Sequence, residues 1–369
     1  MFTGILIFVG GIFVMIVAHE LGHYLTAKHY GIKVEEFFIG FGPRLWSFRR
    51  GETEYGIKAL PLGGYVRIAG MNPFQEPAPA DRDRVFTAKP RRQRAVVLVA
   101  GSFMHFVLAF LLLIGLFVLI GIPRARLAEI EPTLGGRPSP AAAAGLQAGD
   151  EVLAVNGEDV AYDEFLEAIE SNVGREMVIL VERDGREVTV RATPVLSEVE
   201  GQRIARLGVA IATGGRLHEG PVEATGKTFE AIGDMVTGSF RAMGQVFGPE
   251  GLRRIGQLLV GDRERDLTDP VGVVGAARVS GQAVEAGQLD VFFYLFAFFN
   301  VFVGILNILP LPPLDGGHLA VVGIEAVSGR TIDPRRLLPI TAVVAGFLIL
   351  FTVSLLYLDV VSPIPNPFL

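Results

Sequence analysis

The chain contains no cysteine among its 369 residues. This absence excludes disulfide bridges and thiolate metal sites, so histidine and carboxylate side chains remain as the strong metal ligands. Charge is also scarce: only 20% of the residues are charged, whereas 50% are hydrophobic and the mean hydropathy is +0.44. These values predict membrane-spanning segments. The net charge of −6 offers nothing to attract nucleic acid.

Four apolar runs are long enough to cross a bilayer, which takes about 20 helical residues. They cover roughly residues 5–27, 95–122, 291–311 and 338–358. The first run lacks the basic start and the small-residue cleavage site of a signal peptide, so we expect it to be retained. The predicted fold class is an α-helical integral membrane protein with four transmembrane helices, a membrane-associated β-hairpin and an inserted, mostly β domain.

Basic residues are distributed unevenly between the loops. Residues 28–94 hold thirteen Lys and Arg against seven Asp and Glu, whereas residues 124–290 hold seventeen against twenty-seven. By the positive-inside rule, residues 29–94 and the loop 313–336 are cytoplasmic. The chain is then expected to be a multi-pass protein of the inner (plasma) membrane, with both termini and the acidic middle segment extracytoplasmic.

These features predict seven successive parts. They are a first transmembrane helix (1–28), a cytoplasmic loop with a β-hairpin (29–94), a second transmembrane helix (95–122), an extracytoplasmic domain (123–212), an amphipathic linker (213–290), a third transmembrane helix with a cytoplasmic loop (291–337), and a fourth transmembrane helix with the tail (338–369). Alternation around a Pro-Leu-Gly-Gly turn places the hairpin at residues 55–70. An apolar stripe over 226–259 indicates an amphipathic helix, which packs on a soluble core or lies on the membrane surface.

The extracytoplasmic segment has the composition of a compact β-rich unit. The stretch SPAAAAGLQAGDEVLAVNGEDV gives a short helix, an Ala-Gly-Leu turn and a strand, and Asp184-Gly185 marks a hairpin turn. This order of elements resembles a circularly permuted PDZ domain of the bacterial type over residues 128–211. The resemblance implies that the unit binds a newly exposed C-terminus near its Ala-Gly-Leu turn, or screens the size of a partner's ectodomain.

Residues 19–23 read His-Glu-Leu-Gly-His inside the first apolar run. On a helix, His19 and His23 share one face, and both imidazoles can reach one zinc ion. Glu20, beside the first ligand, can accept the proton of a zinc-bound water. Ionisable groups in a membrane helix need a partner, so a metal site accounts for all three.

The third ligand should lie within the membrane and far along the sequence. In the stretch NILPLPPLDGGH, prolines 310, 312 and 313 interrupt the helix, and Asp315 is the candidate ligand. Gly316 and Gly317 would let the backbone approach closely. The alternative is a turn at the membrane edge in which Asp315 only caps the next helix.

Together, the two motifs resemble the site-2 protease family of intramembrane zinc metalloproteases. The pattern N-x-x-P-x-P-x-x-D-G is matched from Asn307 to Gly316. The chain resembles the RseP-like bacterial branch of this family, with a single PDZ domain. Its sequence is more like those of the actinobacterial members. The resemblance implies that His19, His23 and Asp315 bind Zn²⁺, that Glu20 is the general base, and that Asn307 contacts the substrate.

The resemblance also implies that the hairpin enters the membrane, where Leu62, Gly63 and Gly64 would pair with an unwound substrate. Substrates would be single-span membrane proteins, either anti-sigma factors or signal-peptide remnants. One departure stands in the second span, where this chain has His105 in place of the family's asparagine. His105 is either a helix–helix hydrogen-bonding residue or a fourth zinc ligand.

Two other classes of function compete with the protease. A PDZ scaffold with an inert zinc site is one, and the intact Glu20 argues against it. An ion transporter is the other, and the absence of a visible inverted repeat argues against it.

Overall fold

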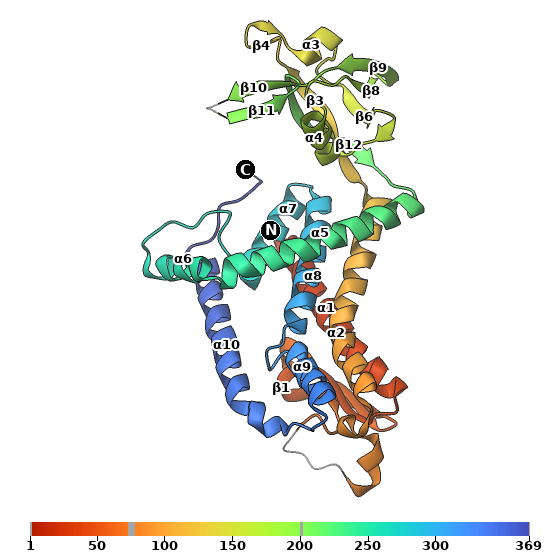
Figure 1. Cartoon of the computed structure of the whole chain (residues 1–369), viewed down its shortest axis with the longest axis vertical. Coiled ribbons are helices and arrows are strands. Elements are labelled where there is room, and N and C mark those ends of the chain that lie inside the picture. The colour runs from red at the N-terminus through yellow and green to blue at the C-terminus, as the bar shows by residue number, and fades with distance from the viewer. Residues whose placement is uncertain (1, 73–77, 200–201, 369) are drawn as a thin grey trace. The chain divides into compact units, whose positions relative to one another are not determined.

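The structure is a computed structural model that describes residues 2–72, 78–199 and 202–368. The chain forms two compact units. Unit 1 comprises residues 1–113 and 227–369, and unit 2 comprises residues 114–226. Figure 1 shows the ribbon of the whole chain.

Unit 1 is mainly helical. Its helices are α1 (Phe2–His29), α2 (Arg91–Gly115), α5 (Pro221–Phe247), α6 (Pro249–Val260), α7 (Val273–Glu285), α8 (Leu289–Ile308), α9 (Asp315–Ser328) and α10 (Leu338–Val361), with α2 and α5 continuing into unit 2. Within the described residues, four helical stretches are long and apolar enough to cross a membrane: Thr3–His29, Arg91–Ile120, Leu289–Ile308 and Arg335–Val361. The prediction of four transmembrane helices is confirmed at this level.

Glycines bring α1, α2 and α8 close together. A Cβ added at Gly22 of α1 would lie 2.4 Å from the Ala100 carbonyl oxygen of α2, and one at Gly304 of α8 would lie 3.0 Å from His105 Cβ of α2. Small residues permit such close helix packing where lipid offers no hydrophobic driving force. Helix α10 instead contacts α6 and α7, and both chain termini lie at the same end of the helical unit (Figure 1).

The loop between α1 and α2 forms a sheet from β1 (Val34–Arg50) and β2 (Thr53–Ile68). The predicted hairpin within residues 55–70 is wrong in its pairing, because the turn between the two strands lies at Gly51-Glu52. Residue Phe38 is aligned with both Gly56 and Tyr65, so the first half of β1 lies between the two halves of β2. The alternation seen in the sequence is therefore that of two strand segments that do not pair with each other.

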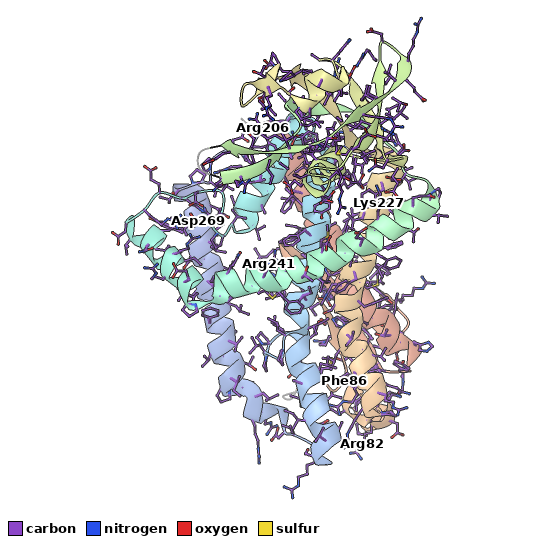
Figure 2. The ribbon with its side chains drawn as sticks, turned by 45° about the horizontal axis from the view of Figure 1, so that its top comes forward. Arg82, Phe86, Arg206, Lys227, Arg241 and Asp269 are labelled. Carbon is purple, nitrogen blue, oxygen red and sulfur yellow. The ribbon has the colours of Figure 1, made fainter. Side chains whose placement is uncertain are left out.

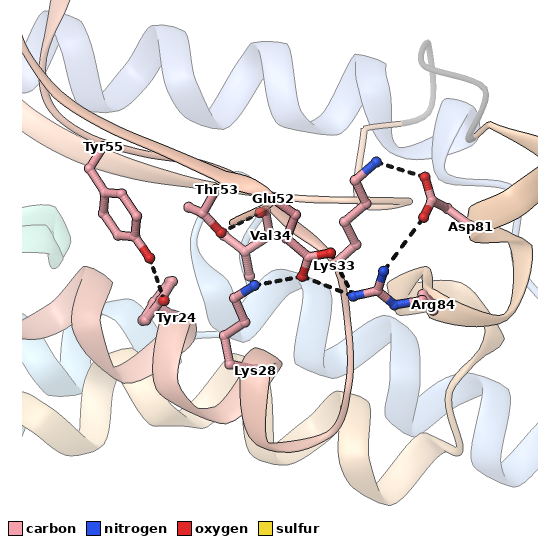
Figure 3. A network of polar contacts seen from close by, with 9 residues as sticks. All are labelled: Tyr24, Lys28, Lys33, Val34, Glu52, Thr53, Tyr55, Asp81 and Arg84. Carbon is pink, nitrogen blue, oxygen red and sulfur yellow. Dashed lines mark hydrogen bonds and ion pairs between the residues drawn. The ribbon is translucent and has the colours of Figure 1, made fainter. Parts of the chain in front are cut away.

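A polar network fastens this sheet to the end of α1 (Figure 3). Glu52, in the β1–β2 turn, accepts hydrogen bonds from Lys28 at 2.6 Å and from Arg84 at 2.7 Å. Lys33 extends the network by an ion pair of 2.7 Å with Asp81. The sheet is thus held at the end of α1 that follows the His-Glu-x-x-His motif.

Unit 2 is built around a six-stranded sheet. Its elements are β3 (Ile122–Ile130), β4 (Thr133–Leu134), β5 (Arg137–Pro138), α3 (Pro140–Ala144), β6 (Glu151–Val155), β7 (Glu158–Asp159), α4 (Tyr162–Ser171), β8 (Met177–Arg183), β9 (Arg186–Ala192), β10 (Val195–Val199), β11 (Gln202–Arg206) and β12 (Val209–Leu217). The strand order is β12-β3-β6-β8-β9, with β7 paired to β6. Phe165 of α4 is fully buried in the core. The hairpin turn predicted at Asp184-Gly185 is confirmed, with both residues at positive φ.

The amphipathic stripe predicted over residues 226–259 falls on two helices. Helix α5 ends at Phe247, and Pro249 begins α6 after the single residue Gly248. Proline is favoured in the first turn of a helix, where its missing N–H is not needed. In Figure 1, α5 runs across the spanning helices of unit 1 rather than along them.

The segment between α6 and α7 is fixed to the end of α10 by a buried ion pair. Arg265 and Asp359 are 2.9 Å apart, and their side chains are 1% and 0% exposed. Asp359 also accepts a hydrogen bond from the Gly275 amide at 2.7 Å, in the first turn of α7. Asp269 of the same segment, which is labelled in Figure 2, pairs with Arg263. The C-terminal end of α10 is therefore anchored by polar contacts as well as by apolar packing.

Candidate metal centre

Three side chains from two distant parts of the chain meet between α1 and the start of α9. The Nε2 atoms of His19 and His23 lie 3.1 Å apart. Asp315 Oδ2 lies 3.3 Å from His19 Nε2 and 3.2 Å from His23 Nε2. The three residues form a group that could hold a metal ion. The structure thus brings together the three residues predicted as ligands.

The spacing of these three atoms fits zinc. With bonds of about 2.0–2.1 Å, two ligand atoms of a tetrahedral zinc ion are separated by roughly 3.3–3.4 Å. The observed separations of 3.1–3.3 Å approach this edge length on all three sides. Two imidazoles and one carboxylate are also a ligand set found in catalytic zinc sites, which keep a fourth position open.

The outer nitrogens of both imidazoles are oriented by α2. His23 Nδ1 lies 2.7 Å from the backbone oxygen of Val97, to which it donates its proton. His19 Nδ1 lies 3.1 Å from His105 Nε2. With its proton on Nδ1, each imidazole presents the lone pair of Nε2 to the centre. Metal-binding histidines are typically held by such a contact behind the ring.

Gly101 of α2 makes one wall of the centre. A Cβ added at this position would lie 2.3 Å from His23 Nε2 and 2.7 Å from His19 Cε1. The imidazoles therefore approach the backbone of α2 in space that a side chain would otherwise fill.

The chain before Asp315 is tightly folded. Helix α8 ends at Ile308, and Asp315 is the first residue of α9. Added Cβ atoms at Gly316 and Gly317 would lie 2.0 Å from the Ile308 oxygen and 2.4 Å from the Pro312 nitrogen. The N-cap of α9 is Leu314, without a side-chain hydrogen bond, so the alternative of Asp315 as a cap does not describe the structure.

Glu20 lies between the two histidines in sequence and faces the sheet. The backbone amide of Val66, in β2, lies near its carboxylate. A Cβ added at Gly64 would lie 3.2 Å from Glu20 Cγ. The second half of β2 therefore runs directly beside the carboxylate, and Gly64 leaves room for the approach.

The other predicted site residues are more scattered. Asn307 is half-buried in the last turn of α8, and Gly63 lies in β2 at φ +145°. The side chain of Leu62 is outside the described part of the chain. The group of residues that could hold a metal, His19, His23 and Asp315, does not include His105, which lies behind His19. His318 lies on α9.

Sequence reasoning missed the contributions of α2 and α8. Val97 contributes a carbonyl and Gly101 contributes the lack of a side chain, so no motif marks either residue. Asn300 of α8 is fully buried beside His105. The one sequence signal that could have identified Asn300 is an asparagine within an apolar run long enough to span a membrane.

Comparison with known proteins agrees with this geometry. The model of peptidase family M50 matches residues 7–352. Zinc metalloprotease Rip1 of Mycobacterium tuberculosis is 33% identical over 98% of this chain and 98% of its own. Zinc metalloprotease RasP of Geobacillus kaustophilus is 30% identical over 86% of this chain and 88% of its own. Metalloprotease MmpA of Caulobacter vibrioides is 33% identical, with 86% and 85% covered. The chain therefore belongs to peptidase family M50, the site-2 protease family of membrane-bound zinc metalloproteases.

Proposed function

We propose that His19, His23 and Asp315 are the zinc ligands of this protease and that Glu20 is its general base. The observation that carries the proposal is the convergence of two imidazole lone pairs and one carboxylate oxygen at the spacing of a tetrahedral site. Without a cation, three electron-rich atoms this close would repel one another in a medium of low dielectric constant. The cluster is therefore best explained as a ligand set.

When bound, zinc supplies Lewis-acid polarisation of the scissile carbonyl and of the attacking water. The remaining chemistry belongs to Glu20. Its carboxylate accepts the proton of the attacking water and passes it to the leaving amine, as a general base and then a general acid. The Val66 amide is placed to orient this carboxylate from the sheet side.

The substrate must be extended at the cleavage site, because a helix conceals its carbonyl groups. The second half of β2 pairs with β1 on one side only within the described sheet, and it runs beside Glu20. We assign Leu62, Gly63 and Gly64 to substrate binding by strand addition at this edge. Asn307 is assigned to contact the substrate backbone from α8.

An apolar cavity of about 760 Å³ supports access from within the membrane. It lies between α5, the end of α8 and α10, and one of its lining residues, Leu314, directly precedes Asp315. Its other walls are almost wholly apolar, among them Phe240, Phe247 and Phe347. Such a lining suits an apolar transmembrane segment better than a soluble peptide.

The physiological substrates are proposed to be single-span membrane proteins, with anti-sigma factors as the first candidate and signal-peptide remnants as the second. Unit 2 is proposed to be an extracytoplasmic PDZ domain that selects among them. Its carboxylate-binding loop is not the Ala-Gly-Leu turn, where the Gly145 and Leu146 amides already bond to carbonyls of α3. The loop at Gly208, which leads into the edge strand β12, is the better candidate.

The proposed orientation can be tested directly, because the chain has no cysteine of its own. A single cysteine introduced at Asn156 should react with an impermeant maleimide in intact cells. One introduced at Asp81 should react only after the membrane is opened. The opposite pattern would reverse the orientation.

Glu20→Gln tests the catalytic assignment. It keeps the shape of the side chain and removes the base, so zinc content should stay near one per chain while cleavage falls by about 10²–10⁴-fold or more. His23→Ala and Asp315→Ala should lose zinc as well as activity. Substantial proteolysis by Glu20→Gln would refute its role as the base.

A further inference from the structure

Two buried polar atoms on facing spans have no hydrogen-bond partner among the described residues. They are Nδ1 of His105 on α2 and Oδ1 of Asn300 on α8. His105 is 3% exposed and Asn300 is 0% exposed. A polar group without a partner in a membrane interior is strongly unfavourable, so the two atoms need an explanation.

The protons around His19 explain both atoms. With Nε2 directed to the metal centre, His19 carries its proton on Nδ1 and donates it to His105 Nε2 over 3.1 Å. His105 must then carry its own proton on Nδ1. The Asn300 side chain lies beside this imidazole. Its amide nitrogen donates to the Phe296 oxygen at 2.8 Å, so Oδ1 is the atom of this side chain that is free to accept a proton from His105.

The packing of α8 holds these groups together. Gly304 lies one turn beyond Asn300, and a Cβ there would lie 3.0 Å from His105 Cβ and 3.3 Å from the Ser102 oxygen. The glycine permits α8 to approach α2 closely at this level. Asn300 and Gly304 are thus on the face of α8 that is turned towards His105.

We propose that His105 is a positioning residue, which fixes the tautomer and the ring orientation of His19 and is itself fixed by Asn300. The chain of hydrogen bonds runs from His19 through His105 and Asn300 to the backbone of α8. It connects the first, second and third spans behind the metal centre. The inference rests on the proposed function, because it takes His19 as a ligand.

This position also decides between the two roles left open for His105. A fourth ligand would have to point a nitrogen at the space between His19 Nε2, His23 Nε2 and Asp315 Oδ2. His105 Nε2 instead faces Nδ1, the nitrogen of His19 that is turned away from that space. The fourth position therefore stays open for water and substrate.

Zinc X-ray absorption and zinc release to a chelator test the proposal on the full-length protein in detergent. Wild type and His105→Phe should both show two imidazoles at zinc. His105→Phe and Asn300→Leu should each release zinc about 10–100-fold faster, the usual effect of removing such an outer contact. His105→Gln, which restores an acceptor for His19, should recover most of the loss. Phe103→Leu, at an exposed position of α2, is the matched control and should behave as wild type.

Two results would overturn the inference. One is an unchanged rate of zinc release in His105→Phe. The other is a count of three imidazoles in the wild type that falls to two in His105→Phe, since His105 would then be a ligand. A wild-type protein that binds no zinc would overturn the proposed metal site itself, and this failure is distinguishable because it needs no variant.

Discussion

Gly101→Ala should abolish zinc binding without touching a ligand. The added methyl carbon would lie 2.3 Å from His23 Nε2, the atom proposed to bind the metal. Carbon and nitrogen normally approach no closer than about 3.4 Å, so the overlap is roughly 1 Å. Metal–ligand distances tolerate deviations of only about 0.2 Å. Because the methyl group is attached to the backbone of α2, the overlap is relieved only if the imidazoles turn away, and they would then leave the positions from which they bind zinc.

Zinc content by mass spectrometry and zinc affinity by chelator competition would measure the effect. We expect affinity to fall by at least 100-fold, while the helical signal in circular dichroism stays unchanged. Gly10→Ala on α1 and Gly115→Ala on α2 are matched controls, since nothing lies within 4 Å of their added Cβ atoms. Zinc bound by Gly101→Ala with wild-type affinity would refute the placement of the two imidazoles against α2.

Two further predictions concern polar contacts of unit 1 near the end of α1 and the start of α2. Arg94 and Glu325 form a buried ion pair of 2.7 Å, so Arg94→Met should lower the free energy of unfolding by about 3–5 kcal/mol in denaturant titrations. The control Arg253→Met removes an exposed ion pair and should leave the free energy of unfolding unchanged. Equal effects of the two substitutions would refute the argument. Partial burial opposes ionisation of Glu52, but hydrogen bonds from Lys28 and Arg84 prevail and lower its pKa. A lowered pKa contributes stability above the ordinary carboxyl value of about 4.3, and this stability is lost as the pH falls through the lowered value. The melting temperature should therefore drop on acidification in this window, and less steeply in Glu52→Gln; parallel curves would contradict the assignment.

The candidate spans and the three residues that meet at the metal centre could be predicted because each leaves a dense local signal. A membrane helix needs about 20 consecutive apolar residues, and His19 and His23 lie one turn apart on one such helix. Asp315 was predictable for a different reason, since the three prolines before it exclude a continuous helix. All of these features are short-range in the sequence.

The pairing of the β1–β2 sheet could not be predicted in the same way. Residues 55–70 alternate as a hairpin would, yet Phe38 lies between the two halves of β2. Alternation shows which face of a strand is apolar, but not which segment supplies its neighbour. That choice depends on long-range contacts, here including the anchor of Glu52 to Lys28 and Arg84.

The second span gives the clearest example of a function that sequence motifs cannot reveal. Helix α2 supplies the Val97 carbonyl behind His23, the bare backbone of Gly101 beside both imidazoles, and His105 behind His19. At its start, Arg94 pairs with Glu325 of α9, the helix that begins with Asp315. Helix α2 thus helps to position all three proposed ligands, although it supplies no ligand itself. This arrangement predicts that substitutions in α2 cause loss of zinc even when every ligand is kept. The identity of the ligands alone would not predict that loss.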